Sequence, residues 1–214
     1  MTLNCKLTIK IFVLLAGIFL CNVSVHAQCS GCTTVITGGS SNFSVNIGQI
    51  VCIDPSVTYT GNITLNGGTL CNQGTLTKVT FKKGIFENHG IFADVNSLAV
   101  NTNGYLRITN YSGATFSVGT GISITSSTGD TVAIYNHPIA LFTSGTSLSA
   151  HDVIFKVFNG DNVNIEPATF NVGAAFSIGD ATEFMLRNYS NGNFNVAGNL
   201  AFNATGNKSI INHG

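Results

Sequence analysis

Apolar and polar residues alternate along most of the chain, in short runs that end at an asparagine. In four of these runs the residues two and four places before the asparagine are apolar. Alternation with a period of two is typical of a β-strand with one buried face and one outward face. The pattern predicts strands over 106–110, 132–136, 155–159 and 184–188.

A second pattern follows these turns: a phenylalanine, five residues, and then an apolar, any, apolar triplet. Successive phenylalanines of this pattern are 24, 26, 28 and 24 residues apart. Strand alternation excludes helical repeats, no regular leucine consensus is present, and a propeller blade needs about 40 residues. The sequence therefore predicts an all-β fold, a right-handed parallel β-helix with 24–28 residues per coil.

Equivalent residues of successive coils in such a solenoid stack about 4.8 Å apart, so like side chains form columns. We expect a core column of Phe92, Phe116, Phe142, Phe170 and Phe194. We also expect a ladder at one corner, made of Asn88, Asn110, Asn136, Asn159 and Asn188. Asparagine tolerates the left-handed turn conformation and can hydrogen-bond to the asparagine of the next coil. A role for these residues as sugar ligands is less favoured, because a corner ladder is not accessible.

Residues 1–27 have the features of a secretory signal peptide. Two lysines precede an apolar run over 11–21, and small residues at 25 and 27 favour cleavage after Ala27. The run is too short for a helix that spans a bilayer. No later stretch is long and apolar enough, so no membrane span is expected in the mature chain.

The remaining chain divides at the start of the regular repeats. We expect residues 28–68 to form an N-terminal cap and the first coils, and residues 69–214 to form the repeats. The final INHG at 211–214 matches ENHG at 87–90, which lies in the middle of a coil. The repeats are therefore expected to be truncated at the C-terminus, and further coils of the same chain are expected partners.

Composition narrows the class of protein. Charged residues make up 8% of the sequence, and the mature chain carries seven Lys and Arg against nine Asp and Glu. Without a basic patch, nucleic acid binding is not expected. Hydrophobic residues reach 44%, which is typical of a folded chain rather than of a disordered one.

Four cysteines lie in the mature chain, all near its new N-terminus. An exported chain meets oxidising conditions, so disulfides are expected and three connectivities are possible. We favour Cys52–Cys71 together with Cys29–Cys32, which would pin the cap. A zinc site is less favoured, because Cys52 and Cys71 do not form a second C-x-x-C motif.

No catalytic residues, metal site or cofactor are expected from the pattern. The carboxylates are spread along the chain, and no column gathers three of them. His89, His137 and His213 each follow a ladder asparagine, while Tyr111, Gly160 and Tyr189 hold the same place between them. Histidines two coils apart would be about 10 Å from each other, too far to share a metal ion. We interpret these side chains as solvated turn residues.

The stretch GQIVCIDPSVTYTGNITLNGGTLCNQGTL at 48–76 resembles exported parallel β-helix repeat proteins of gliding-type Gram-negative bacteria. Members are typically adhesin-like surface or secreted proteins, often exported by the type IX route with a C-terminal sorting domain. The resemblance implies a similar fold for this chain and no catalytic residues.

These observations together favour a non-enzymatic, adhesin-like stalk of a larger secreted or cell-surface protein. Its expected partners are glycans or host and environmental surfaces. The alternative is a polysaccharide-active β-helix enzyme, a lyase or hydrolase, whose site lies in further coils.

Overall fold

The computed structural model describes residues 29–126, 129–203 and 205–213, and all of their regular structure is β-strand. The predicted signal peptide at 1–27 lies outside these residues. Within the described ranges, no helix has the length and apolar character needed to cross a membrane.

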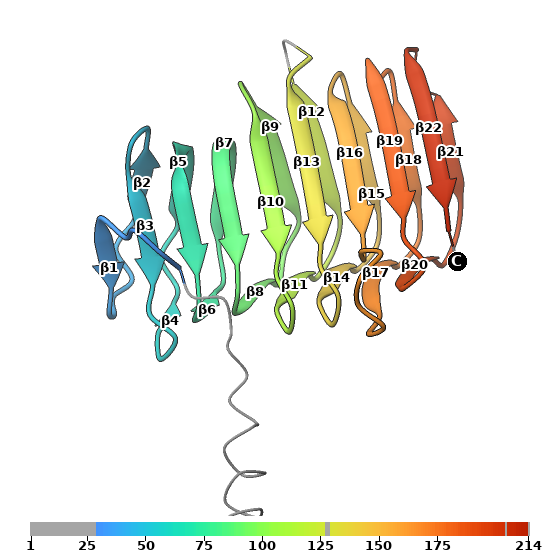
Figure 1. The fold of residues 1–214 in the computed structure, drawn as a ribbon. Helices are drawn as coiled ribbons and strands as arrows, with labels where there is room; N and C mark the ends of the chain where they lie inside the picture. The colour runs from blue at the N-terminus through green and yellow to red at the C-terminus, as the bar shows by residue number, and fades with distance from the viewer. Residues whose placement is uncertain (1–28, 127–128, 204, 214) are drawn as a thin grey trace, which may run out of the picture.

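The strands form three parallel sheets that wind into a solenoid of about seven turns (Figure 1). Sheet A runs in the order β1 (Thr34–Ile36), β3 (Ile50–Ile53), β5 (Ile63–Asn72), β7 (Val79–Asn88), β10 (Leu106–Asn110), β13 (Thr131–Asn136), β16 (Ile154–Asn159), β19 (Glu183–Asn188) and β22 (Asn207–Asn212), with β2 (Phe43–Asn46) beside β5. Sheet B runs through β4 (Thr58–Tyr59), β6 (Thr75–Leu76), β8 (Ile91–Asp94), β11 (Thr115–Val118), β14 (Leu141–Ser144), β17 (Ala168–Val172) and β20 (Gly192–Val196). Sheet C runs through β9 (Leu98–Thr102), β12 (Ile122–Ser126), β15 (Leu148–His151), β18 (Phe176–Gly179) and β21 (Leu200–Asn203).

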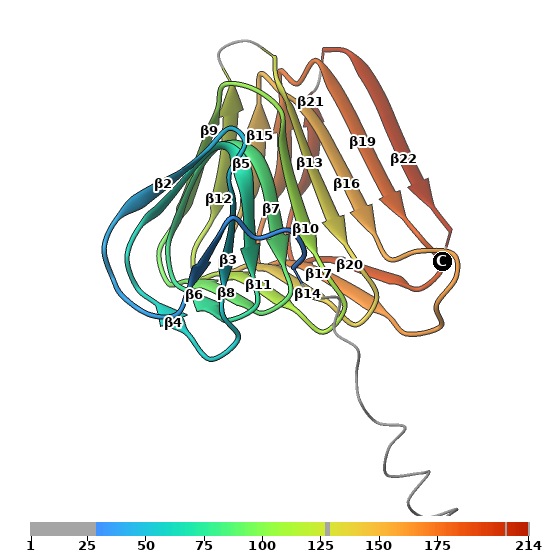
Figure 2. The same ribbon diagram turned by 60° about the vertical axis from the view of Figure 1, so that its left-hand side comes forward.

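Each regular coil contributes one strand to every sheet, in the order A, B and C. Figure 2 shows sheet B joining the lower edges of sheets A and C, which face each other across the core. Side chains alternate between this core and the outside along each strand, as the burial pattern of β16 illustrates. The all-β parallel solenoid predicted from the sequence is therefore confirmed.

The phenylalanines of the repeat lie in one core column on sheet B. Phe92, Phe116, Phe142, Phe170 and Phe194 are register partners from β8 to β20. Successive ring centroids are 4.6, 4.6, 4.3 and 5.0 Å apart. Each ring thus covers the next, and the first four are fully buried. This stacking explains why the sequence repeats phenylalanine at one position of these five successive coils, which follow Tyr59 and Leu76 at the equivalent place.

The coils at the N-terminal end are shorter than the predicted 24–28 residues. Asn72 and Asn88 occupy equivalent positions only 16 residues apart. The ten-residue strands β5 and β7 bend at an irregularity in their pairing instead of ending at a turn. Gly84 permits this bend: its φ is 113°, and a Cβ there would lie 2.4 Å from the Gly68 carbonyl oxygen.

The predicted disulfide pairing is wrong, although the cysteines do pin the N-terminal end. Cys29 is bonded to Cys71, and Cys32 to Cys52. Cys52 and Cys71 are register partners on β3 and β5, so both point away from the core on the same side. Residues 29–32 cross this side, and each of their cysteines reaches a different strand. Stacking of the coils, rather than separation along the chain, determines the pairing.

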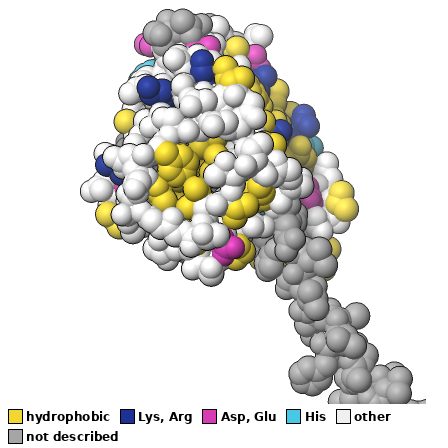
Figure 3. Space-filling view, turned by 90° about the vertical axis from the view of Figure 1, so that its left-hand side faces the viewer, with side chains coloured by type: hydrophobic (Ala, Val, Ile, Leu, Met, Phe, Trp, Pro, Cys, Tyr) yellow, Lys and Arg dark blue, Asp and Glu magenta, His cyan; other side chains and the backbone are white. Residues whose placement is uncertain are grey.

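Figure 3 looks along the solenoid from the end that carries β1. Hydrophobic side chains lie at the centre of this end and polar groups surround them. Ile36 and Phe43 are partly buried residues that pack against the core from the first coils. The predicted cap region at 28–68 therefore supplies strands β1 to β4 and part of β5, which continue the parallel sheets.

Candidate functional site: an outward aromatic column

The asparagine ladder lies at the corner where sheet A turns into sheet B. The side-chain amides of Asn88, Asn110, Asn136, Asn159 and Asn188 are hydrogen-bonded in this order, with Nδ2 to Oδ1 distances of 2.8, 2.9, 2.8 and 2.8 Å. Asn72 donates to Asn88 at one end, and Asn188 donates to Asn212 at the other. The sequence prediction left out these two ends, although CNQG and INHG carry the same signal.

From Asn88 to Asn159, each ladder amide also donates to a backbone carbonyl of sheet B in the next coil. The second Nδ2 hydrogen of Asn110, for example, is donated to the Leu141 carbonyl oxygen at 2.9 Å. Both hydrogens are therefore used, one along the ladder and one on the backbone of sheet B. The predicted asparagines are between 0% and 7% exposed, so they hold the corner and do not face a ligand.

The residue after each ladder asparagine points outward and forms a second column. His89 stacks on Tyr111 with 4.0 Å between ring centroids, and Tyr111 stacks on His137 at 5.1 Å. Tyr189 stacks on His213 at 6.1 Å further along. We call these five residues the aromatic column. The three histidines were interpreted from the sequence as solvated turn residues. The structure stacks them on the tyrosines of the same column, within 13° of parallel.

The aromatic column is interrupted at Gly160. The backbone amide of Gly160 donates to the Asn136 carbonyl, and that of Tyr189 donates to the Asn159 carbonyl. Gly160 therefore holds the position between His137 and Tyr189 but offers no ring. A pocket of about 440 Å³ opens here, and its lining includes both flanking rings. A size of this order is typical of small-ligand sites.

A loop borders the pocket and begins at Gly160, where φ is 85°. The Asp161 carboxylate accepts backbone hydrogen bonds from Val163 and Asn164, both at 2.9 Å. Asn191 of the next coil donates to the carbonyl oxygens of Asn164 and Glu166, at 2.9 and 3.2 Å. These bonds fix the loop against the coil that carries Tyr189.

The charges at the pocket follow from this geometry. Burial lowers the pKa of His137, and the nearby Asp161 carboxylate opposes this change in part. Backbone hydrogen bonds from Asn164 and Val163 lower the pKa of Asp161, although burial works against them. At neutral pH the pocket therefore offers an uncharged imidazole ring and an ionised carboxylate.

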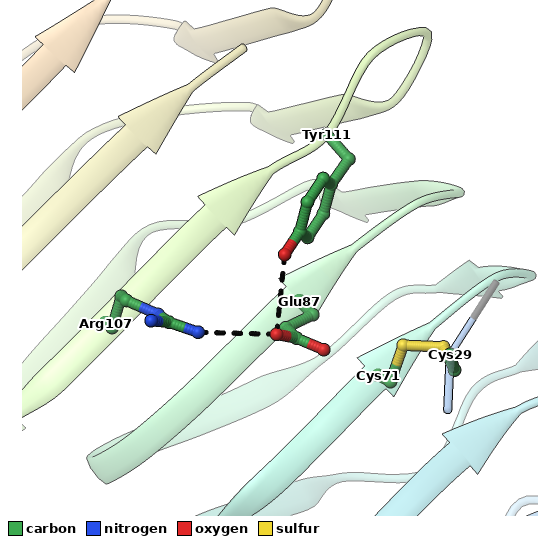
Figure 4. A network of polar contacts seen from close by, with 5 residues as sticks. All are labelled: Cys29, Cys71, Glu87, Arg107 and Tyr111. Carbon is green, nitrogen blue, oxygen red and sulfur yellow. Dashed lines mark hydrogen bonds and ion pairs between the residues drawn. A yellow bond between two sulfur atoms is a disulfide. The ribbon is translucent and has the colours of Figure 1, made fainter. Parts of the chain in front are cut away.

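A second polar group lies on the same face near the N-terminal end, as Figure 4 shows. The Glu87 carboxylate accepts hydrogen bonds from the Arg107 guanidinium at 3.3 Å and from the Tyr111 hydroxyl at 3.5 Å. Burial, followed by the charge of Glu87, raises the pKa of the Tyr111 hydroxyl. A phenol that keeps its proton acts here as a donor that bridges coils, and it is a poor general base.

One group of potential metal ligands occurs among residues 29–126, 129–203 and 205–213: Cys29, Cys71 and His89. Both of its cysteine sulfurs are used in the same disulfide. A disulfide sulfur has no thiolate to offer a metal ion, so this group does not fit a metal centre.

Comparisons with known proteins identified no relative of this chain. No family model, no curated protein and no solved structure matches the chain. By its fold, the chain is a parallel β-solenoid with two disulfides near its N-terminal end.

Proposed function

We propose that the chain is a non-enzymatic, adhesin-like stalk of an exported protein that contacts glycans through the aromatic column. The observation that carries this proposal is the column itself, a row of stacked flat rings on an outward face with a gap at Gly160. The rings of the column cover one another except beside Gly160, and the aromatic faces left there are suited to contact with the C–H faces of a sugar. The stalk would present this row to a cell or environmental surface.

Export is supported by the two disulfides at the N-terminal end. Such bonds persist in oxidising compartments and are rare where thiols are kept reduced. The lysines, apolar run and small residues of 1–27 agree with this location. Type IX export and a larger surface protein belong to the same proposal and rest on the resemblance of residues 48–76.

The stacked architecture supports a role as a stalk. Each coil packs only on its neighbours through parallel strands, so added coils lengthen the solenoid without a change of its cross-section. The side-chain ladder and the phenylalanine column continue from coil to coil in the same way.

Adhesion can be measured directly with the full chain, produced with oxidised disulfides and immobilised on beads. We expect these beads to bind particles of at least one neutral polysaccharide, such as cellulose or chitin, more strongly than albumin-coated beads do. Reducing the disulfides should weaken the attachment because it loosens the N-terminal coils. Equal binding by both kinds of bead would contradict an adhesive function.

The sequence placed the site of the polysaccharide-active alternative in further coils. Within the described coils, the contact of Glu87 with Arg107 and Tyr111 on an outward face is a second place where such a site could be tested. A carboxylate beside a guanidinium and a phenol contains group types used in polysaccharide cleavage. Release of new reducing ends from soluble polysaccharides would support this alternative. The release should then be lost in Glu87→Gln and retained in Glu183→Gln, which alters the carboxylate of the separate ion pair with Lys156.

A further inference from the structure

We infer that the gap in the aromatic column at Gly160 is a binding slot for one neutral sugar ring of a glycan, held between His137 and Tyr189. The inference rests on the proposed adhesive function and makes it specific to one site. Elsewhere in the same column, the equivalent space is filled by an aromatic ring.

The filled part of the column shows what a ring at this position contacts. Tyr111 lies between His89 at 4.0 Å and His137 at 5.1 Å, so one ring occupies the space between two histidines. His137 and Tyr189 are likewise two coils apart, about 9–10 Å from the strand spacing. Their intervening residue is glycine, so two ring faces are left without the partner that the rest of the column has.

The two walls of the slot are supported from behind. Tyr111 backs His137 at 5.1 Å, while His213 backs Tyr189 at 6.1 Å. The Arg187 guanidinium also lies 5.9 Å from the centroid of the Tyr189 ring. Because these contacts restrict both rings before a ligand arrives, less conformational freedom is lost on binding.

The slot cannot be closed by a side chain at position 160. A Cβ there would lie 2.2 Å from Oδ1 of Asn191, and the φ of 85° disfavours residues other than glycine. The Asn191 amide lies where a side chain of residue 160 would begin, so its hydrogen bond from the Asp161 backbone depends on glycine at this position.

The width of the slot admits one ring of a ligand. A ring centred in it would be about 4.8 Å from each wall, half the distance of two coils. A flat ring fills the equivalent space at Tyr111, 4.0 and 5.1 Å from its neighbours, so a planar ligand is tested beside the sugars. A pyranose chair is thicker, and its axial C–H groups point toward both aromatic faces.

The polar groups around the slot match a neutral sugar. Oδ2 of Asp161 accepts one hydrogen bond, from Asn164 at 2.7 Å, and a carboxylate oxygen can accept another from a hydroxyl. The exposed Asn162 side chain also lines the pocket. No lysine or arginine is among the lining residues, and Asp161 would repel a phosphate or a uronate. The remaining lining includes the stacked rings of Tyr135 and Phe158, 4.7 Å apart.

The test uses the full chain with intact disulfides and four neutral probes: cellotriose, chitotriose, maltotriose and mannotriose. The sequence has no tryptophan and five tyrosines, so tyrosine fluorescence reports on the slot, and calorimetry gives the affinity. We expect at least one probe to bind. His137→Ala and Tyr189→Ala should each weaken that binding at least tenfold, because each removes one stacking face.

Two matched variants control for effects on folding. Tyr189→Phe retains the ring and should bind within about threefold of the unaltered chain. Tyr105→Ala removes an exposed aromatic ring that lies outside both the aromatic column and the pocket, and it should leave the affinity unchanged. Trigalacturonate should bind more weakly than the neutral probes because of Asp161.

Several results would overturn the inference. Binding that survives in Tyr189→Ala would place the sugar elsewhere on the chain and leave the adhesive function standing. Failure of the unaltered chain to bind any probe would reject the slot, while bead adhesion tests the adhesive function separately. Tighter binding of trigalacturonate, or of adenosine with the same dependence on Tyr189, would reject a neutral sugar as the ligand.

Discussion

Nδ2 of Asn110 lies 2.9 Å from Oδ1 of Asn136, although 26 residues separate them in the sequence. This contact is one rung of a ladder that runs through the solenoid at a single corner. Every rung joins two coils through side chains, and the second amide hydrogen of Asn110 binds the backbone of sheet B in the next coil. The same side chains therefore hold the coils in register and fix the path of the backbone where sheet A turns into sheet B.

Replacing Asn110 should destabilise the solenoid strongly. In Asn110→Ala, Oδ1 of Asn136 and the Leu141 carbonyl both lose the donor Nδ2. A buried polar group without a partner costs about 1–3 kcal/mol, so we expect a loss of about 3–5 kcal/mol in the free energy of unfolding. Urea denaturation followed by circular dichroism measures this loss.

Asn195 provides the matched control, because it donates to Asn171 at 2.9 Å in an exposed pair between coils. Water can replace that partner, so Asn195→Ala should cost less than about 1 kcal/mol. Equal losses in Asn110→Ala and Asn195→Ala would show that burial of the ladder does not determine its contribution.

The phenylalanine column should respond to truncation according to burial. Phe142 is fully buried between Phe116 and Phe170, at centroid distances of 4.6 and 4.3 Å. Phe142→Ala leaves a cavity in this stack and should cost about 3–5 kcal/mol of unfolding free energy. Phe194 is only partly buried, so Phe194→Ala should cost clearly less. A cost for Phe194→Ala as large as that for Phe142→Ala would contradict a role for burial.

The columns could be predicted from the sequence because each coil repeats the same local pattern. Phe116 and Phe142 are recognisable by their distance from the following apolar triplet, and this distance does not depend on the turns. Stacking then follows from the one assumption that coils lie in register. The ladder was predictable for the same reason, since Asn110 and Asn136 end equivalent strands.

The disulfides and the pocket depend on features that a repeat does not contain. Cys29 and Cys32 lie before the first strand, so no register defines which strands they cross. The pocket arises from a glycine and an irregular loop, and its only sequence signals were Gly160 in the aromatic column and the 28-residue step. The stacking of His137 on Tyr111 was not predicted, because the histidines were compared with one another as metal ligands and not with the tyrosines between them.

The connectivity of the disulfides predicts their effect on stability. The Cys29–Cys71 and Cys32–Cys52 bonds have sequence separations of 42 and 20 residues. Loop-closure entropy gives about 4 kcal/mol for the longer separation and about 3 kcal/mol for the shorter one. Cys29→Ser with Cys71→Ser should therefore destabilise the chain somewhat more than Cys32→Ser with Cys52→Ser.

Peptide mapping of the unreduced chain checks the connectivity itself. Proteolytic fragments that contain Cys29 and Cys71 should remain joined until a reductant is added. A fragment that joins Cys52 to Cys71 would contradict the stacked arrangement of residues 29–32 on β3 and β5.

The lowered pKa of His137 predicts a pH dependence of stability. Below its ordinary pKa of 6.5 the unfolded chain binds a proton at this residue more readily than the folded chain does. The contribution of His137 to the free energy of unfolding should therefore be complete well above pH 6.5. It should decrease as the pH is lowered from 6.5 toward the lower pKa that His137 has in the folded chain. The carboxylate of Asp161, whose pKa is also lowered, loses its contribution only at lower pH, below 3.8.

Thermal unfolding between pH 5 and pH 8 measures the difference between the unaltered chain and His137→Gln. We expect the variant to show a shallower decline on the acidic side, because glutamine does not titrate. Identical declines would show that His137 is as easily protonated in the aromatic column as in the unfolded chain.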